Sequence, residues 1–214
     1  MSTEPSRADA TNFLLRSPLR LELGCGPRKR NNDSVGVDLL SGPGVDIVGD
    51  ALMVLRSFPD ASVDEVFSEH FMEHIDDPRA LLEEAARILK PGGMFRAVVP
   101  HFSNPWFYSD PTHRSFFGLY TFSYWIEEAP FRRKVPHYDH PLPFELMSAR
   151  HSFKSSRPFL VRHGIKKVLS SWVNLSRWTQ EFYEEFCTVM VPCHEIDYRL
   201  RRLESDATRG NLLN

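Results

Sequence analysis

Residues 21–27, Leu-Glu-Leu-Gly-Cys-Gly-Pro, constrain the fold of this chain more than any other segment. A short, mostly apolar run leads into a turn that contains two glycines, Gly24 and Gly26. Because glycine has no Cβ, the backbone of such a turn can adopt positive φ and can approach a ligand closely. In a parallel α/β sheet, a turn of this kind follows the first strand and lies where a nucleotide-like ligand binds. The segment therefore predicts the first strand of such a sheet and a ligand-binding turn after it.

The glycine turn lacks the remainder of a dinucleotide-binding fingerprint. That fingerprint has a third glycine and opens a long helix. Here Pro27 follows Gly26 directly, and the next residues are Arg-Lys-Arg-Asn-Asn-Asp at 28–33. The turn alone leaves open whether the ligand is a nicotinamide dinucleotide, as in an oxidoreductase, or another nucleotide-like cofactor.

Short runs rich in β-branched residues recur downstream. They predict four further strands, at 35–38, 45–48, 63–68 and 94–100. An aspartate lies at or just after the ends of the first two of these strands, at Asp38 and Asp50. Since the carboxyl ends of parallel strands meet at one edge of a sheet, both acids are expected near the glycine turn.

The segment between the fourth and fifth predicted strands has the pattern of an amphipathic helix. Asp76 or Asp77 can cap it, Pro78 suits its first turn, and Lys-Pro-Gly-Gly at 90–93 ends it. Its apolar face is formed by Leu81, Leu82, Ala85, Ile88 and Leu89. A strand, a helix and a second strand in this order form a right-handed parallel unit, so the predicted class is α/β with a mostly parallel sheet.

The connections near the start of the chain are short. About ten residues separate Gly26 from Val37, whereas a parallel pair usually needs a dozen or more. The first crossover helix is therefore expected to have two turns at most. Fewer residues still separate Asp38 from Val45. Either the third strand is a short edge piece reached through Ser-Gly-Pro-Gly at 41–44, or one of the strand predictions is wrong.

Composition limits the class of protein. A chain of 214 residues with 42% hydrophobic and 25% charged residues suits one soluble domain, and no apolar run approaches the ~20 residues of a membrane span. Residues 1–17 are predicted to be a flexible leader and 18–214 a single domain. The charged amino terminus and three cysteines without a C-x-x-C pair indicate a cytoplasmic protein with reduced thiols. The net charge of −2 gives no case for a nucleic-acid partner.

Five motifs in a fixed order carry a family resemblance. They are the glycine turn, Asp38, Gly-Asp-Ala-Leu at 49–52, Ser-Glu-His-Phe-Met-Glu-His-Ile at 68–75, and Leu-Lys-Pro-Gly-Gly at 89–93. In this order the chain resembles the class I S-adenosylmethionine-dependent methyltransferases. It is similar, more loosely, to the small bacterial, methyltransferase-11-like members that act in polysaccharide or natural-product pathways.

The resemblance implies a fold, a cofactor and a set of binding residues. The fold is a Rossmann-like, mostly parallel seven-stranded sheet with helices on both faces, shortened first helices and an antiparallel last strand, for which residues 195–203 have a suitable alternating pattern. The cofactor is S-adenosylmethionine. By resemblance, the cofactor-binding residues are Glu22, Gly24, Cys25, Gly26, Asp38, Leu39, Asp50, Ala51, Leu52, Ser68, Glu69 and His70.

The chemistry of the two aspartates supports this assignment independently. A carboxylate at a strand end can accept hydrogen bonds from both hydroxyls of a ribose, which suits Asp38, while the resemblance gives Asp50 the adenine amino group. The alternative is that both aspartates only form turns or cap helices, which is the commonest role of aspartate after a strand. Glu73 and His74 are predicted to be structural hydrogen-bonding residues.

Residues 101–160 are predicted to form an acceptor-binding lid. The stretch from 100 to 125 is rich in aromatics, prolines and histidines, and it follows the strand whose carboxyl end faces the ligand crevice. His101 and His113 are the candidate general bases, because imidazole titrates near neutral pH. Candidate substrate-binding residues in the same segment are Trp106, Tyr108, Asp110 and Arg114.

The predicted reaction is direct in-line transfer of a methyl group to a small-molecule acceptor, with a hydroxyl of a sugar or natural product as the expected acceptor group and a histidine receiving the proton. A non-catalytic methyltransferase-like scaffold is a further alternative. No metal is predicted, because His137, Asp139 and His140, even with His101, His113 or His151, fit no firm zinc spacing. An apolar stripe near the carboxyl terminus is predicted to pack in the core or in a homodimer contact; it consists of Leu175, Trp178, Phe182, Phe186 and Val189.

Overall fold

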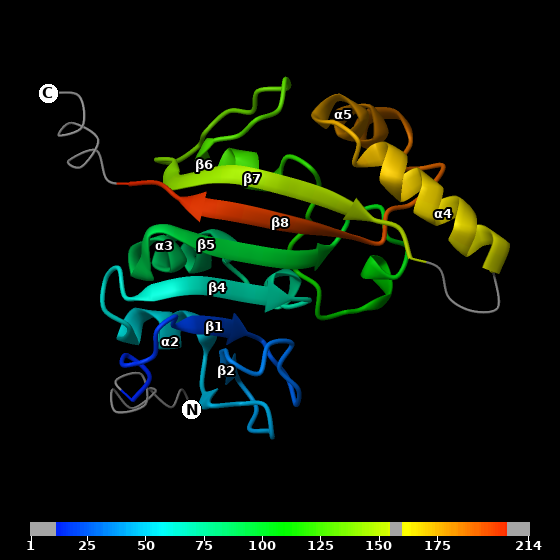
Figure 1. Ribbon diagram of the computed structural model, residues 1–214. Helices are drawn as coiled ribbons and strands as arrows, with labels where there is room; N and C mark the ends of the chain where they lie inside the picture. The colour runs from blue at the N-terminus through cyan, green and yellow to red at the C-terminus, as the bar shows by residue number, and fades with distance from the viewer. Residues whose placement is uncertain (1–11, 155–159, 205–214) are drawn as a thin grey trace, which may run out of the picture.

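The computed structural model describes residues 12–154 and 160–204, and one sheet of eight strands runs through them (Figure 1). The strand order across the sheet is β3-β2-β1-β4-β5-β8-β7-β6. The strands are β1 (Arg20–Leu23), β2 (Val35–Asp38), β3 (Ile47–Val48), β4 (Val63–Glu69), β5 (Leu89–Pro100), β6 (Ile126–Glu128), β7 (Leu142–Ser152) and β8 (Glu195–Arg202).

The directions of the strands confirm the predicted class. The neighbours among β3, β2, β1, β4 and β5 pair in parallel, while β8 pairs antiparallel with both β5 and β7. The sheet has one strand more than the seven predicted. The additional strand is β6, a piece of three residues that pairs in parallel with β7 at the edge.

Two helices cover one face of the parallel part of the sheet. They are α2 (Ala51–Ser57) and α3 (Pro78–Ile88), and Figure 1 shows α3 behind β5. Asp77 caps α3 by accepting the amide of Ala80 at 2.9 Å, and the predicted apolar residues of this helix are buried. The prediction for this segment is confirmed to within one residue at its end.

The opposite face of β1, β4 and β5 differs from the prediction of helices on both faces. Arg20 and Glu65 form an ion pair there with side chains 35% and 37% exposed, and Arg96 pairs with Asp197. The connections β1–β2 and β2–β3 would have to supply helices for this face. Among the described residues they contain none, because they are too short.

The predicted lid contains a strand of the main sheet. After β5 the chain forms two short 3₁₀ helices, η2 (Phe107–Ser109) and η3 (Thr121–Tyr124), before β6. Residues 142–152 then form β7, so the irregular part of the predicted lid ends at residue 141. Several aromatics of this segment are core residues. Phe122 packs against Phe95 of β5 with ring centroids 6.3 Å apart.

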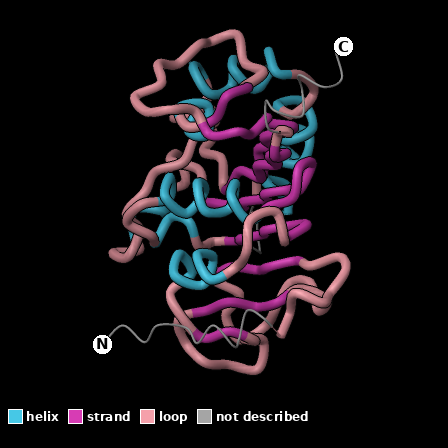
Figure 2. The backbone as a smooth tube through the Cα atoms, turned by 90° about the vertical axis from the view of Figure 1, so that its left-hand side faces the viewer, coloured by secondary structure: helices cyan, strands magenta, loops and turns pink. Residues whose placement is uncertain are grey.

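Helices α4 (Leu160–Val173) and α5 (Arg177–Phe186) lie near the carboxyl end of β7 (Figure 1), and Figure 2 shows the strands as one twisted layer. The core alternative for the carboxyl-terminal apolar stripe was wrong. Trp178 is 55% and Phe186 60% exposed, because α5 buries Thr179, Gln180 and Tyr183 instead. In the described part of the chain, no helix combines the length and the apolar character that a membrane span requires.

Candidate functional site

A cavity of about 460 Å³ lies at the carboxyl ends of β1 and β2. It brings together many of the residues that the sequence assigned to the cofactor. They are Gly24, Asp38, Leu39, Asp50, Ala51 and Leu52. It is also lined by residues that the sequence did not assign to it, namely Phe71, His74, Ile75, Asp76, Asp77 and Leu81. The signal that could have found several of these was their position directly after β4, at the same edge of the sheet.

The two positions of the turn differ in what surrounds their glycines. Gly24 has φ +64°, and a Cβ there would lie 2.5 Å from a ring carbon of Phe71. The packing of Phe71, rather than a ligand, therefore requires a glycine at this position. Gly26 has φ +57°, and no atom lies within 4 Å of a Cβ placed there. Gly26 thus has open space where a Cβ would lie, although Gly24, and not Gly26, is among the residues that line the cavity.

Asp38 links the glycine turn to the end of β2. Its Oδ2 accepts the amide of Gly26 at 2.8 Å, and its Oδ1 accepts the amide of Leu40 at 2.9 Å. Asp38 therefore does form turns with its carboxylate, as the alternative interpretation predicted. Each carboxylate oxygen can accept more than one hydrogen bond, so both remain able to bind a diol. Beside it, Leu39 is 70% exposed, which offers an apolar surface that a planar ring could cover.

Asp50 is the N-cap residue of α2. Its Oδ1 accepts the amide of Met53 at 3.0 Å, so the capping alternative also holds. The second carboxylate oxygen of this exposed residue faces no hydrogen-bond donor among the described residues. Ala51 and Leu52, the first residues of α2, line the cavity next to it.

Glu22 and Cys25 lie outside the cavity. Glu22 is buried and accepts the amides of Arg30 and Asn31 and the hydroxyl of Ser34, which secures the loop after the glycine turn. Burial, with the nearby carboxylates of Asp38 and Glu22, raises the pKa of the Cys25 thiol to about 11. The structure thus gives both residues a role in shaping the turn rather than in contacting a ligand.

The residues at the end of β4 also lie outside the lining of this cavity. Ser68 is fully buried, and Glu69 pairs with Arg30 at 2.8 Å. Hydrogen bonds to Glu195 and Glu73 raise the pKa of His70 to about 9. His70 is therefore an imidazolium at neutral pH and has no lone pair with which to receive a proton.

His113 is held next to His74 and Glu73. The Nδ1 of His113 lies 2.9 Å from the carbonyl oxygen of Phe107, so it must donate and the lone pair is on Nε2. The rings of His113 and His74 are 4.8 Å apart, and His74 lines the cavity. The carbonyl of Glu73 accepts the amide of Arg114 at 2.7 Å, which attaches the lid segment to η1 (Met72–His74).

His101 is not placed as a general base. It is fully buried, and its Nε2 lies 3.0 Å from Oε2 of Glu184, which His151 also contacts at 3.3 Å. The backbone amide of Ser103 donates to Nδ1 of His101. Because both ring nitrogens are engaged and no surface is exposed, we assign His101 to the packing of α5 against the sheet.

Of the four predicted substrate-binding residues, one lines the cavity and three do not. Arg114 lines the cavity and pairs with Asp76. Asp110 accepts both the amide and the hydroxyl of Thr112 and so forms the lid turn. Trp106 and Tyr108 do not line this cavity, although more than half of each side chain is exposed. Only Arg114 is placed directly beside the predicted cofactor residues.

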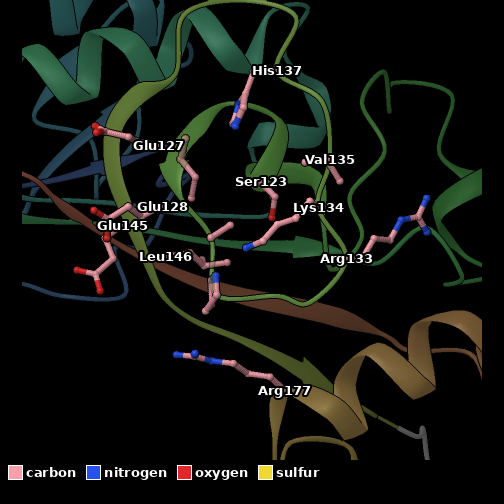
Figure 3. A pocket seen from close by; sticks show the side chains of 13 residues that line it. Ser123, Glu127, Glu128, Arg133, Lys134, Val135, His137, Glu145, Leu146 and Arg177 are labelled. Atoms are coloured by element: carbon pink, nitrogen blue, oxygen red, sulfur yellow. The ribbon is translucent and has the colours of Figure 1, made fainter.

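A second cavity, of about 420 Å³, lies under residues 129–137 at the other edge of the sheet. Figure 3 shows Glu127, Glu128 and Glu145 gathered on one side of it, with Lys134 and Arg133 on the other. It contains none of the predicted site residues. We regard the cavity at the glycine turn as the candidate functional site, because it combines the strand-end acids with that turn.

The chain is similar in sequence and in fold to known methyltransferases. A family model described as a methyltransferase domain matches residues 26–97. No curated protein sequence matches the chain. A solved S-adenosylmethionine-dependent methyltransferase from Archaeoglobus fulgidus is similar over 92% of each chain, with 17% identity and a TM-score of 0.50.

A second solved structure is phosphoethanolamine N-methyltransferase 2 from Haemonchus contortus, in complex with phosphomonomethylethanolamine and S-adenosylhomocysteine. The similarity covers 93% of this chain and 52% of that chain, with 14% identity and a TM-score of 0.50. At such identities the structural likeness shows the fold alone. The family match within 26–97 begins at Gly26 of the glycine turn and covers both strand-end acids, and the solved structures share the fold of the whole sheet.

Proposed function

We propose that this protein is a class I methyltransferase that uses S-adenosylmethionine and transfers its methyl group to a hydroxyl of a small molecule, such as a sugar or a natural product. The observation that carries the proposal is the position of His74 and Arg114 on the cavity that Gly24, Asp38 and Asp50 also line. A ring nitrogen of His113, Nε2, lies next to them. Such a nitrogen can receive the proton that a hydroxyl loses on methylation.

The residues of the cavity fit the cofactor. Asp38 can accept the two ribose hydroxyls, and Asp50 has a carboxylate oxygen available for the adenine amino group. The backbone at Gly24 lines the cavity, Gly26 beside it has open space where a Cβ would lie, and the exposed Leu39 can cover one face of the adenine. When bound, the cofactor supplies an electrophilic methyl group. The protein holds the acceptor in line with that methyl and excludes water.

The general base in this proposal is His113. Its Nδ1 donates to the Phe107 carbonyl, so the lone pair stays on Nε2 and the ring orientation is fixed. Arg114, the next residue, can position a polar acceptor at the mouth of the cavity. Trp106 and Tyr108 are the proposed outer acceptor contacts, because exposed aromatic rings pack well against sugar rings.

Calorimetry tests the cofactor assignment. We expect S-adenosylhomocysteine to bind and NAD not to bind, and we expect Asp38→Ala to weaken that binding by about 1.5–3 kcal/mol, the value of a hydrogen bond to a charged group. Binding of NAD alone would support the oxidoreductase alternative, and binding of neither would favour a scaffold. Thermal unfolding of the variant controls for loss of the turn that Asp38 stabilises.

The acceptor and the base are tested by turnover. Candidate hydroxyl compounds are screened by mass spectrometry for the gain of one methylene, using protein treated with a chelator. In that preparation His113→Ala should lower kcat by about 10²–10⁴-fold, the usual worth of a general base, with unchanged affinity for S-adenosylhomocysteine. Full turnover of the variant would exclude His113 as the base.

The assembly and the location of the protein also belong to the proposal. Trp178 and Phe186 are exposed on α5, which favours the homodimer alternative for the apolar stripe. Sedimentation velocity of the full chain measures this directly, and a monomer at all concentrations would contradict it. We retain a cytoplasmic location and the absence of a nucleic-acid partner as parts of the same proposal.

A further inference from the structure

Three side chains of two separate segments converge beside the cavity. Glu73 and His74 come from η1, and His113 comes from the lid segment. One ligand atom from each, a carboxylate oxygen or a ring nitrogen, lies within 4.8 Å of the other two. We propose that these three residues bind a divalent transition-metal ion, with Zn²⁺ as the representative ion.

The hydrogen bonds around the two histidines leave the nitrogen that a metal needs. The hydroxyl of Thr112 donates to Asp110 at 2.6 Å, so its oxygen accepts from Nδ1 of His74, which lies 2.9 Å away. Nδ1 of His113 donates to the carbonyl of Phe107. Both rings therefore carry their lone pair on Nε2. Histidines that bind metals almost always donate their other ring N–H to a carbonyl, a carboxylate or a similar group, as these two do.

Glu73 provides the second, independent observation. Its side chain is 1% exposed, and its Oε2 has no hydrogen-bond partner. A buried carboxylate oxygen without a partner is costly, and a metal ion would satisfy it. The other oxygen, Oε1, lies 3.4 Å from Nδ1 of His70, which holds the carboxylate in place. Glu73, His74 and His113 thus offer three ligand atoms to one ion.

The site requires only a small closure. Metal–ligand distances of about 2.0–2.2 Å in a tetrahedral site place neighbouring ligand atoms about 3.4 Å apart. The present separations of up to 4.8 Å can reach this value by rotation of the two histidine side chains, both of which are partly exposed. Nε2 of His113 lies 3.8 Å from a carboxylate oxygen of Asp110, which is too long for a hydrogen bond and does not block the site.

Two imidazoles and one carboxylate favour zinc and other first-row transition metals over magnesium or calcium. Three protein ligands also leave one position open, as in catalytic rather than structural sites. Since His74 lines the cavity, an acceptor hydroxyl could occupy that position and lose its proton more readily. This last step rests on the proposed function, whereas the binding of the ion does not. In the ion-bound protein His113 is a ligand, and in the ion-free protein it is free to act as base.

The other group of this kind was rejected. His101, His151 and Glu184 also lie within 4.8 Å of one another, but both histidines already contact Oε2 of Glu184 and are fully buried. In that group the Nε2 atom of each histidine already contacts Oε2 of Glu184, and the ring nitrogen of His151 that has no partner among the described residues, Nδ1, is not the one that meets Glu184.

The experiment is titration of the full-length protein with ZnCl₂ by calorimetry, without cofactor or acceptor, and with CoCl₂ by visible absorption. We expect one ion per chain. His74→Ala and His113→Ala should each weaken binding by about tenfold or more, and so should Thr112→Val, which removes the partner of His74. His137→Ala and His140→Ala, at exposed histidines of the loop before β7, are the matched controls and should bind as the parent protein does.

Absence of stoichiometric binding to the parent protein would overturn the proposal. Undiminished binding to both His74→Ala and His113→Ala would overturn it as well, as would loss of binding in the controls alone. Glu73→Gln is informative only if circular dichroism shows that it folds, but the two histidine variants decide the question without it. Because no methyl transfer is measured, failure here leaves the test of S-adenosylhomocysteine binding unaffected.

Discussion

At the scale of single residues, the two glycines of the turn serve different purposes: Gly24 makes room for the ring of Phe71, and Gly26 leaves open space beside the turn. Gly24 and Gly26 have nearly equal positive φ, +64° and +57°, but only Gly24 is enclosed, by the ring of Phe71. The ring of a residue after β4 therefore fixes the shape of the turn after β1. The sequence predicted two glycines close to a ligand, whereas only Gly26 has open space beside it.

Alanine substitutions separate the packing requirement at Gly24 from the backbone requirement at Gly26. Gly26→Ala should lower the free energy of unfolding by about 1–2 kcal/mol, the cost of left-handed backbone in a residue with a Cβ. Gly24→Ala should cost more, because Phe71 must also move. Gly92→Ala is the control, since Gly92 has φ +79° with open space and lies far from the cavity.

Urea denaturation and calorimetry measure the three variants side by side. We expect Gly26→Ala to weaken the binding of S-adenosylhomocysteine and Gly92→Ala to leave it unchanged. If Gly24→Ala were no less stable than Gly92→Ala, the contact with Phe71 would not be the reason for the glycine.

At the scale of elements, periodic segments were predictable and the connections were not. The helix at 78–88 and strands β1, β2, β4 and β8 follow from apolar periodicity and turn residues, which act locally. Residues 142–152 were assigned to the acceptor-binding lid, yet they form β7. The carbonyl of Pro143 accepts the amide of Leu203 at 2.8 Å. A proline can therefore lie in β7 although it has no N–H to donate.

The candidate site was predictable only in part, for the same reason. The place of Asp38 and Asp50 at the cavity was predictable, because each follows a predicted strand. His74 was assigned a structural role, and its approach to His113 depends on the lid segment folding back onto η1. Contacts between distant segments of this kind leave no periodic pattern in either segment.

The N-terminus of α2 allows the cap and the ligand contact to be separated. Asp50→Ser should keep the N-cap, since serine and aspartate cap equally well, and so should leave the free energy of unfolding within about 0.5 kcal/mol of the parent protein. It should still weaken cofactor binding, because serine has no carboxylate for the adenine amino group. Asp50→Ala should lose the cap as well, at a cost of about 1 kcal/mol. Unchanged affinity in both variants would show that Asp50 is only a cap.

At the scale of the whole molecule, one buried carboxylate joins the two halves of the sheet to α5. Glu184 accepts the amide of Leu119 at 2.7 Å through Oε1, and both His101 and His151 contact its Oε2. Burial opposes its ionisation, but the hydrogen bonds from the two histidines outweigh burial and lower the pKa of Glu184 from 4.5 to about 2. Burial also lowers the pKa of His151. The network is therefore formed by an ionised Glu184 next to a His151 that is not protonated at neutral pH.

Acid should weaken the fold through this network. A carboxyl group whose pKa is lower in the folded state stabilises the protein above its unfolded pKa, and this contribution is lost as the pH falls from about 4.5 toward 2. His151 adds to this loss of stability from pH 6.5 downward, because its imidazole is protonated more readily in the unfolded chain than in the folded protein.

Glu184→Gln should lower the free energy of unfolding at neutral pH by about 1.5–3 kcal/mol, the value of hydrogen bonds to a charged group. It should also make that free energy less dependent on pH below 4.5, although Glu195, with a pKa of about 2, will keep part of the slope. Glu145→Gln, which breaks an exposed pair with Arg201, is the matched control and should change stability by less than about 1 kcal/mol. Urea titrations of the three proteins between pH 7 and pH 3 measure these differences, and equal slopes for Glu184→Gln and the parent protein would show that Glu184 does not govern acid stability.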